Sequence, residues 1–160
     1  MFAKKILPLI LLLMAAYSCK TKTTTAMPTI KAYAVRLKPG ADLKKSIQTF
    51  VNENKLSAAW IVTCAGSLTH YNIRFANQQT AASDSGHFEI VSLAGTLSEN
   101  GSHIHISISD STGKTIGGHL QEGCIIYTTA EIIIQSSDKL IFTRKNDGTT
   151  PWEELQVEGK

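Results

Sequence analysis

The sequence has few charged residues and no block of basic ones. Charged side chains make up 18% of its 160 residues, below the roughly 25% that is typical of globular chains, which argues against a disordered chain. The 16 Lys and Arg residues exceed the 13 Asp and Glu residues by a formal charge of only +3. Without a Lys/Arg-rich segment, this charge does not give the electrostatic footprint of a strongly basic nucleic-acid binder.

The sequence also lacks an internal repeat, a second domain and a disulfide framework. Its length suits one hydrophobic core, which serves roughly 100–200 residues. Besides Cys19, the cysteines are Cys64 and Cys124, which lie in apolar surroundings far apart in the chain. Buried free thiols are common and this spacing is no framework pattern, although one disulfide in an oxidising envelope stays an alternative.

A hydrophobic run long enough to span a membrane is missing too. The apolar run Ile6 to Tyr17, which contains Pro8, follows the short basic segment 1–5. It is about a dozen residues long, whereas a transmembrane helix needs about 20. The pattern predicts a cleaved export signal over residues 1–18.

The end of this signal resembles that of a bacterial lipoprotein. Small and apolar residues 14–18 lead into Cys19, and a polar, Thr-rich stretch follows. In such signals the cysteine is diacylated, becomes the first residue and is usually acylated again, and two or three acyl chains hold a protein on a membrane stably. Residues 19–29 would then be a lipidated polar tether, on a protein that faces the periplasm or the exterior from the cell envelope.

The alternative is an ordinary secretory signal cut near Ser18, which would leave a soluble periplasmic or secreted protein. Tyr17 departs from the small residue most often found at its position. In both cases the removal of Lys4 and Lys5 lowers the formal side-chain charge from +3 to about +1, which weakens the case for nucleic acid further.

The rest of the chain predicts an α+β domain with one main helix. Asp42 can cap a helix whose apolar residues recur at helical spacing; they are Leu43, Ile47, Phe50 and Val51. The other periodic segments are short runs rich in Ile, Val, Thr and aromatics between turn residues, typical of strands. The predicted strands are Ile30–Leu37, Ala58–Thr63, Leu68–Phe75, His87–Leu97, His103–Ser109, Thr115–Leu120, Ile125–Gln135 and Lys139–Arg144.

The turns favour a large, mostly antiparallel sheet. Gly101 and the Asp110–Gly113 cluster supply tight hairpins between consecutive strands. One helix cannot cover both faces of such a sheet, and the run Ile125 to Ile134 is apolar on both faces, as in a strand buried on both sides. Self-association is the simplest way to cover the second face.

Two histidines share one face of a predicted strand. His103 and His105 alternate with isoleucines, so a period of two aims both imidazoles the same way, with Cα atoms about 7 Å apart. His119 lies on the expected hairpin partner of that strand. Three neutral imidazoles that meet with one position left open form a catalytic type of zinc site, which can hold water or polarise a carbonyl. The alternative is that these are ordinary surface or cross-strand histidines.

Gly117 and Gly118 precede the third histidine. Residues without side chains let a backbone or a substrate approach closely, but a plain β-bulge fits them equally well. His70 and His87 have no comparable partner in the sequence and are interpreted as surface or interface residues.

Glu89 and Glu131 lie within otherwise apolar strands, where a carboxylate rarely stays unpaired. Either could accept the free N–H of a ligand histidine or act as a general acid or base. The alternative is an ion pair with one of the arginines at positions 36, 74 and 144. The Glu153-Glu154 pair is most simply solvated.

Five motifs in this order resemble those of one known family. They are Cys64–Leu68, Gly86–Leu97, Gly101–Asp110, Gly117–Leu120 and Tyr127–Ile132. They look like the successive motifs of the plants-and-prokaryotes-conserved (PPC) domain, also called the domain of unknown function 296 (DUF296) and labelled "PD1-like DNA-binding protein". The resemblance covers the chain from about Ile30 to Leu155, and we predict the domain over residues 30–156.

The resemblance implies an α+β domain that assembles as a homotrimer. It also implies a fold similar to that of acetolactate decarboxylase, a zinc lyase whose metal is held by three histidines. Carried over, this puts a zinc-like divalent metal on His103, His105 and His119. The chemistry of the lyase does not carry over, because a shared fold does not fix a reaction.

The DNA-binding label of the family does not suit this sequence. In plants the domain follows an AT-hook, a basic arm that enters the minor groove, and this chain has no such arm. In plant nuclear members the domain itself mainly mediates association with itself and with other proteins. The sequence therefore favours a lipid-anchored homotrimer whose metal site binds a small ligand, with catalysis left open. The alternative is a non-enzymatic assembly module, and nucleic-acid binding is the third hypothesis.

Overall fold

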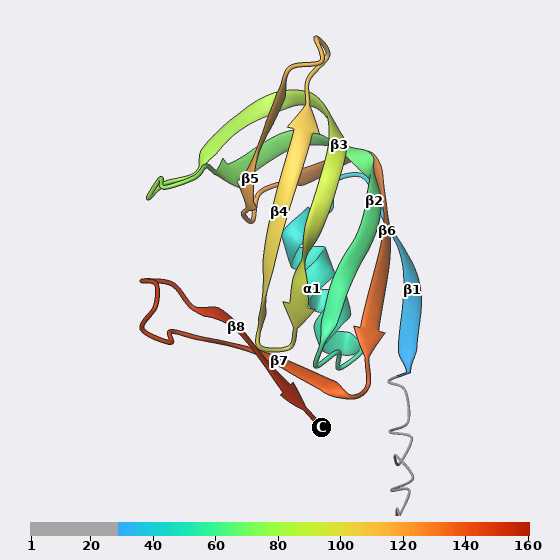
Figure 1. Cartoon of the computed structure of the whole chain (residues 1–160). Coiled ribbons are helices and arrows are strands. Elements are labelled where there is room, and N and C mark those ends of the chain that lie inside the picture. Colours follow the sequence, from blue (N-terminus) through green and yellow to red (C-terminus); the bar gives the residue numbers. More distant parts are fainter. Residues whose placement is uncertain (1–28) are drawn as a thin grey trace, which may run out of the picture.

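The computed structural model describes residues 29–160. The predicted signal, Cys19 and nearly all of the predicted tether lie outside the described residues. The elements are β1 (Ile30–Leu37), α1 (Leu43–Glu53), β2 (Ala59–Arg74), β3 (Ala82–Ser98), β4 (Gly101–Ser109), β5 (Thr115–Leu120), β6 (Ile125–Ser137), β7 (Leu140–Lys145) and β8 (Glu154–Gly159) (Figure 1). No helix within this part of the chain is long and apolar enough to span a membrane.

Six strands form one antiparallel sheet in the order β1-β6-β2-β3-β4-β5. The end of β2 also pairs with β5, through Ile73 with Leu120 and Arg74 with His119. This extra pairing curls β2 to β5 into a partly closed barrel at one end of the sheet. The predicted mostly antiparallel sheet with one helix is confirmed.

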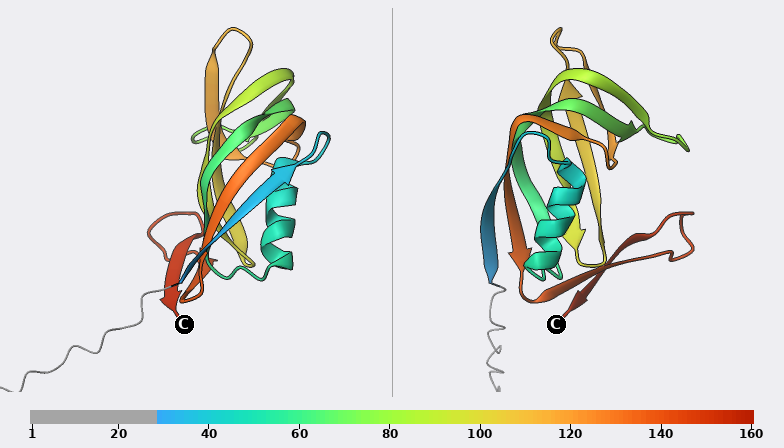
Figure 2. Two further views of the ribbon diagram at one scale, coloured as in Figure 1. Left: turned by 90° about the vertical axis from the view of Figure 1, so that its right-hand side faces the viewer. Right: turned by 180° about the vertical axis from the view of Figure 1, so that it is seen from behind.

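Helix α1 covers one face of the sheet (Figure 2). Its apolar stripe faces inward, with Leu43, Ile47 and Val51 at most 2% exposed. Burying each such side chain stabilises the fold by about 1.5–3 kcal/mol. Phe50 completes the stripe and packs edge-on against Tyr33 at a ring distance of 5.5 Å, which ties the helix to the edge strand β1.

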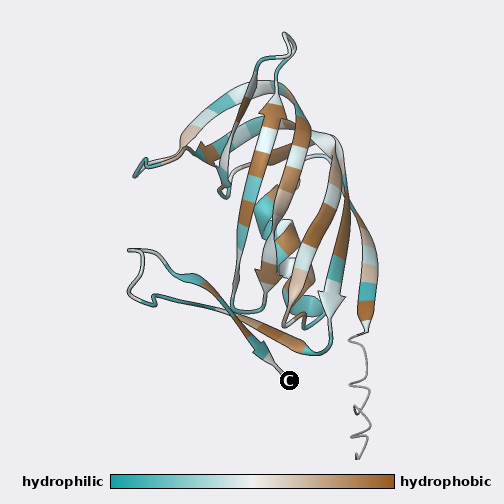
Figure 3. Cartoon of the chain, in the orientation of Figure 1, coloured by the Kyte–Doolittle hydropathy of each residue, from teal (hydrophilic) through white to brown (hydrophobic). Residues whose placement is uncertain are grey.

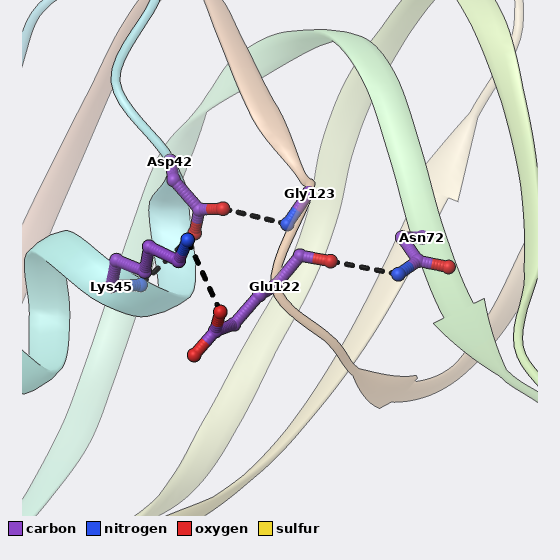
Figure 4. A network of polar contacts seen from close by, with 5 residues as sticks. All are labelled: Asp42, Lys45, Asn72, Glu122 and Gly123. Atoms are coloured by element: carbon purple, nitrogen blue, oxygen red, sulfur yellow. Dashed lines mark hydrogen bonds and ion pairs between the residues drawn. The ribbon is translucent and has the colours of Figure 1, made fainter.

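The predicted helix cap is confirmed. One carboxylate oxygen of Asp42 accepts a hydrogen bond from the Lys45 backbone N–H at 2.9 Å, which satisfies a free donor of the first turn. The other oxygen accepts from the Gly123 N–H at 2.6 Å (Figure 4). Lys45 pairs with Glu122 at 3.2 Å, and Asn72 donates to the Glu122 carbonyl at 2.7 Å. The start of α1 is thus fastened to β2 and to the β5–β6 turn.

Two expectations about the strands are wrong. The predicted strands Ala58–Thr63 and Leu68–Phe75 form the single strand β2, whose register shifts absorb the Cys64–Ser67 segment without a turn. A Cβ at Gly66 would collide with the Thr129 carbonyl and lie 2.7 Å from Ala130 Cα, so the glycine lets β2 and β6 approach. In addition, the sequence does not predict β8, which begins at Glu154, the second residue of the acidic pair interpreted as simply solvated.

The second face of the sheet carries no helix within residues 29–160. Exposed apolar side chains lie on it, among them Val62, Val91 and Tyr127 at 49%, 59% and 43% exposure. On β6 the burial alternates, so that Ile132 is buried whereas Glu131 is exposed. Within one chain, β6 is therefore buried on one face only, and burial of the other face remains a prediction about self-association.

Candidate metal centre

The two faces of β4 differ in character, as the alternation of its sequence predicts (Figure 3). Ile104, Ile106 and Ile108 are at most 2% exposed and pack in the core. On the other face, His103 is half-buried and His105 is exposed. The isoleucines fix the strand on the core, and this aims both imidazoles outward.

A tight turn brings the third histidine to the same place. In the β4–β5 turn, the Asp110 carboxylate accepts from the backbone N–H of Thr112 at 2.8 Å and of Lys114 at 3.1 Å, and from the Thr112 hydroxyl at 2.6 Å. These bonds lower the pKa of Asp110 and set the hairpin register. In that register His105 lies directly opposite His119.

The three imidazoles converge on one point. Nε2 of His103 lies 3.2 Å from Nε2 of His105 and 3.1 Å from Nδ1 of His119, and the latter two atoms are 3.2 Å apart. These residues form a group that could hold a metal ion. The structure thus brings together all three histidines that the sequence singled out.

Hydrogen bonds among the three rings cannot satisfy all three of these ring nitrogens. A neutral imidazole has one N–H and one lone pair, so an inward N–H can serve only one neighbour and the remaining lone pairs face each other. A cation at the centre accepts all three lone pairs. Tetrahedral zinc with Zn–N bonds of about 2.0–2.1 Å places its ligand nitrogens about 3.3–3.4 Å apart, close to the spacing seen here. The donor set therefore fits a zinc-like ion.

The surroundings of His103 and His119 favour the neutral imidazole, which is the form that binds metal. Burial lowers the pKa of His119 to about 4, aided by the nearby charges of Arg74 and His105. Burial also lowers the pKa of His103, with further contributions from Arg144 and His105. Both shifts favour the neutral form of these two imidazoles.

The glycines around the cluster permit close packing of strands. A Cβ at Gly118 would lie 2.5 Å from the Arg74 carbonyl oxygen, and one at Gly117 would lie 2.8 Å from that of Ile106. At Gly95 a Cβ would collide with the carbonyl of His103. The approaching groups are thus the backbones of β2 and β4, and this packing holds His119 against β4 and β2.

A cavity of about 650 Å³ opens beside the cluster. His103 and His119 line it, together with Arg74 from the end of β2 and Arg144, Trp152 and others from the β7–β8 hairpin. His105 lies on the other side, over a shallow groove against Ala94 and Thr96 of β3. The cluster can therefore be reached from the cavity through two of its three rings.

Sequence reasoning considered both arginines only as ion-pair partners and did not single out Trp152. Arg74 reaches the site because the β2–β5 closure sets it opposite His119. Arg144 Nη2 lies 3.4 Å from His103 Nδ1 and donates to the Glu153 carbonyl at 2.6 Å. No local pattern marks these positions, since pairings between distant segments create them.

The structure places the two candidate glutamates elsewhere. Glu89 lies opposite Ser67 and Ser109, and Glu131 lies opposite Arg36 and Ala65. Both are exposed and neither lines the histidine cavity. Within the described residues neither forms an ion pair, and Arg36 instead donates to Thr129 at 3.1 Å. The ion pairs considered as an alternative are therefore not found.

The remaining candidates also lie away from the cluster. His70 Nδ1 is 2.9 Å from the Ser85 hydroxyl, and the His87 ring lies 4.5 Å from that of Tyr127. Cys64 and Cys124 are buried free thiols. The Cys124 thiol donates to the Asn72 carbonyl and accepts from the Asn72 N–H, so it is part of the core.

The acidic pair near the C-terminus is not simply solvated. The Glu154 carboxylate accepts from the Thr150 hydroxyl at 2.7 Å, and Glu153 supplies the carbonyl that Arg144 binds. Both residues line the cavity. The β7–β8 pairing, which the sequence did not indicate, brings them there.

Solved structures of known proteins share this fold. A hypothetical protein from Salmonella enterica is 39% identical, with a TM-score of 0.81 over 83% of this chain and 96% of that one. A metal-containing protein from Archaeoglobus fulgidus is 25% identical, with a TM-score of 0.68 over 79% and 93%. A plant- and prokaryote-conserved protein from Pyrococcus horikoshii is 28% identical, with a TM-score of 0.64 over 82% and 98%.

Curated relatives are much longer than this chain. Two proteins named bifunctional protein GlmU, from two strains of Synechococcus, are 39% and 38% identical over 129 residues, or 81% of this chain. The chain spans only about a fifth of their length, 21% and 20%. Residues 24–138 match the Plants and Prokaryotes Conserved (PCC) domain. The chain therefore belongs to the PCC-domain family, as its motifs predict.

Proposed function

We propose that this chain is an exported, lipid-anchored PCC-domain protein that forms a homotrimer and binds a small ligand at a three-histidine zinc centre. The observation that carries the metal part is the triangle of ring nitrogens 3.1–3.2 Å apart. His103, His105 and His119 would hold the ion. The relative described as a metal-containing protein, which shares the fold, supports this assignment.

The surroundings of the cluster suit a binding site. A zinc ion held by three imidazoles keeps a further position open, where it can polarise a carbonyl or activate water. The adjacent cavity of about 650 Å³ lies within the range of about 300–1,000 Å³ usual for small-molecule sites. His103 and His119 line this cavity, so a ligand there would lie directly beside the ion.

The proposal also includes export, a lipid anchor at Cys19 and assembly as a trimer. The signal pattern of residues 1–18 supports export to the cell envelope, with a soluble periplasmic or secreted protein as the alternative. The uncovered sheet face with Val62, Val91 and Tyr127 supports self-association, since large exposed apolar patches mark interaction sites.

The same face supports a second candidate, a non-enzymatic assembly or protein-interaction module. In the GlmU relatives the similar segment is only about a fifth of a longer protein, which suits a module that accompanies other domains. In this case the histidines would be structural. The DNA-binding activity implied by the family label is the weakest candidate, because the net charge is small and no basic arm is present.

Metal analysis tests the centre. The full chain, purified without a polyhistidine tag, should contain about one metal ion per chain by inductively coupled plasma mass spectrometry. The His103→Ala/His105→Ala variant should contain almost none, because one imidazole alone does not retain zinc. The matched control His70→Ala/His87→Ala removes two histidines outside the cluster and should keep the metal.

Light scattering on the same samples tests the assembly that both candidates expect, and the metal content separates the two candidates. The proposal expects a trimer in all three proteins and metal in only two of them. Equal and negligible metal in the wild type and in the cluster variant would remove the metal centre and leave the assembly module.

A further inference from the structure

The β7–β8 hairpin closes one side of the histidine cavity, although it follows the segment that matches the family. It is anchored at its base, where the Phe142 N–H donates to the Ser57 carbonyl at 2.8 Å and Asn100 donates to the Phe142 carbonyl at 3.2 Å. Figure 1 shows the hairpin crossing beneath the β3–β4 turn. Its side chains are therefore held at a fixed place relative to the cluster.

Two guanidinium groups line this cavity, Arg74 from β2 and Arg144 from β7. The ion pairs among the described residues are Lys45–Glu122 and Lys145–Glu158, so neither arginine has a carboxylate within salt-bridge distance. Arg74 donates to the Gln78 carbonyl at 3.2 Å, and Arg144 donates to the Glu153 carbonyl at 2.6 Å. Neutral carbonyls orient both groups, and neither group is in direct contact with a carboxylate.

The two acidic residues that line the cavity form no ion pair with these arginines. The Glu154 carboxylate is bound by the Thr150 hydroxyl at 2.7 Å. Glu153 is exposed and contributes its backbone carbonyl. A guanidinium has five N–H donors in a planar fork that matches a carboxylate or a phosphate, and only one or two of these donors are used here.

Trp152 adds an apolar wall. Its side chain is 53% exposed although it lines the cavity, and the Arg74 guanidinium lies 5.2 Å from its ring centroid. This cation–π contact orients Arg74. An exposed indole beside oriented cations is suited to the carbon skeleton of a small organic anion.

The contact between Arg144 and His103 also bears on this site. The 3.4 Å contact is a hydrogen bond only while Nδ1 of His103 carries a lone pair. If Nε2 of His103 holds a metal, Nδ1 carries the proton and cannot accept from Arg144. Metal loading would thus leave that guanidinium donor available to another acceptor.

We propose that the cavity selects a small organic anion, whose carboxylate or phosphate group binds Arg74 and Arg144 while its second oxygen group faces the histidine centre. The proposal rests on the metal centre proposed above and names the ligand class of that site. Arg74 and Arg144 are then specificity residues, and Trp152 packs against the ligand skeleton.

Calorimetric titration tests the charge selectivity. The full chain loaded with one zinc per chain is titrated with pyruvate, with methylphosphonate and with pyruvamide, a neutral analogue of pyruvate of the same size. At least one anion should bind about tenfold or more tightly than pyruvamide, since hydrogen bonds to charged groups are worth that factor or more. The tighter of the two anions identifies a carboxylate or a phosphate as the preferred group.

Arginine variants locate the selectivity. Arg74→Gln should weaken anion binding about tenfold or more while zinc content and pyruvamide binding stay unchanged. Arg144→Gln is the second variant and should act in the same direction. The matched control Lys145→Gln removes the same charge from the next residue of β7, whose side chain pairs with Glu158 away from the cavity, and should have no effect.

Each failure has its own pattern. If the chain binds zinc but binds neither pyruvate nor methylphosphonate more tightly than pyruvamide, or if neither arginine variant weakens anion binding, the anion site is overturned and the metal centre is left intact. A chain that takes up no metal overturns the metal centre first and the anion site with it.

Discussion

Large side chains recur at every second residue on both faces of β4, but the two faces have different roles. On the inner face Ile104, Ile106 and Ile108 are at most 2% exposed, and their burial stabilises the fold. On the outer face His103 and His105 contribute little to the core but place two ring nitrogens 3.2 Å apart. One face therefore holds the strand in place so that the other can position ligands, and substitutions on the two faces should have separable effects.

Ile108→Ala should have the largest effect, and on stability alone. Ile108 is 0% exposed, and truncating such a residue lowers the free energy of unfolding by about 2–5 kcal/mol. Urea denaturation of the metal-free proteins measures this loss. The folded variant should still bind one zinc per chain. Val157→Ala, at a site in β8 that is 55% exposed, is the control and should change stability by about 0.5 kcal/mol or less.

His119→Ala should show the reverse pattern. It removes one of the three proposed metal ligands, so zinc affinity should fall by more than the roughly 10–100-fold that follows loss of a hydrogen-bond partner of a ligand. Competition with a chelating dye measures the affinity. His119 is only half-buried, so the metal-free variant should unfold at nearly the wild-type urea concentration. Strong destabilisation without loss of zinc would contradict the separation of the two faces.

Gly118→Ala should lower both the stability of the fold and the zinc affinity. The added Cβ would lie 2.5 Å from the Arg74 carbonyl and 3.0 Å from Ile73 Cγ2, so β5 must move away from β2. Overpacking of this kind costs about 1–3 kcal/mol, and the shift carries the neighbouring His119 with it. Both the urea midpoint and the zinc affinity should decrease. Gly113→Ala, where an added Cβ meets nothing within 4 Å, controls for the glycine effect on the unfolded chain, although its positive φ adds some strain.

Ionisation and alkylation of the two buried thiols should give the smallest effect, and they measure how well the core excludes solvent. Burial raises the pKa of Cys64 and of Cys124 to about 11. The native state therefore keeps its thiol protons while the unfolded chain loses them, and stability should decrease as pH rises from about 9 towards 11. Alkylation by iodoacetamide at pH 9 should be more than about tenfold slower in native than in urea-unfolded protein. Equal rates would show that the inner face is open to solvent.

Local patterns in the sequence were enough to predict the two faces of β4, the return of His119 and the start of the helix. The period of two identified both faces of β4, the Asp110–Gly113 turn indicated where His119 returns, and Asp42 marked the helix start. The same period also explains why Glu131 is exposed next to the buried Ile132. An apolar neighbourhood in a strand does not bury every residue in it, so the run Ile125 to Ile134 is not buried on both faces within one chain.

The rest of the site depends on contacts between distant segments. Arg74 reaches His119 only through the closure of β2 on β5, and Arg144 and Trp152 reach the cavity only through the β7–β8 hairpin. No turn residue or periodicity near these positions specifies either pairing. The apparent break between the two halves of β2 likewise conceals a continuous strand, whose register against β6 shifts at several points.

The closure of β2 on β5 also determines where the six-stranded sheet has a free edge. Since β5 pairs with β4 along its length and meets β2 at Leu120, the long unpaired edge of this sheet is β1. That strand carries the exposed charges of Lys31 and Arg36, and charged side chains on an edge discourage the addition of another strand. Extension of the sheet from one copy to the next is thereby disfavoured, so the self-association proposed above would use the broad face.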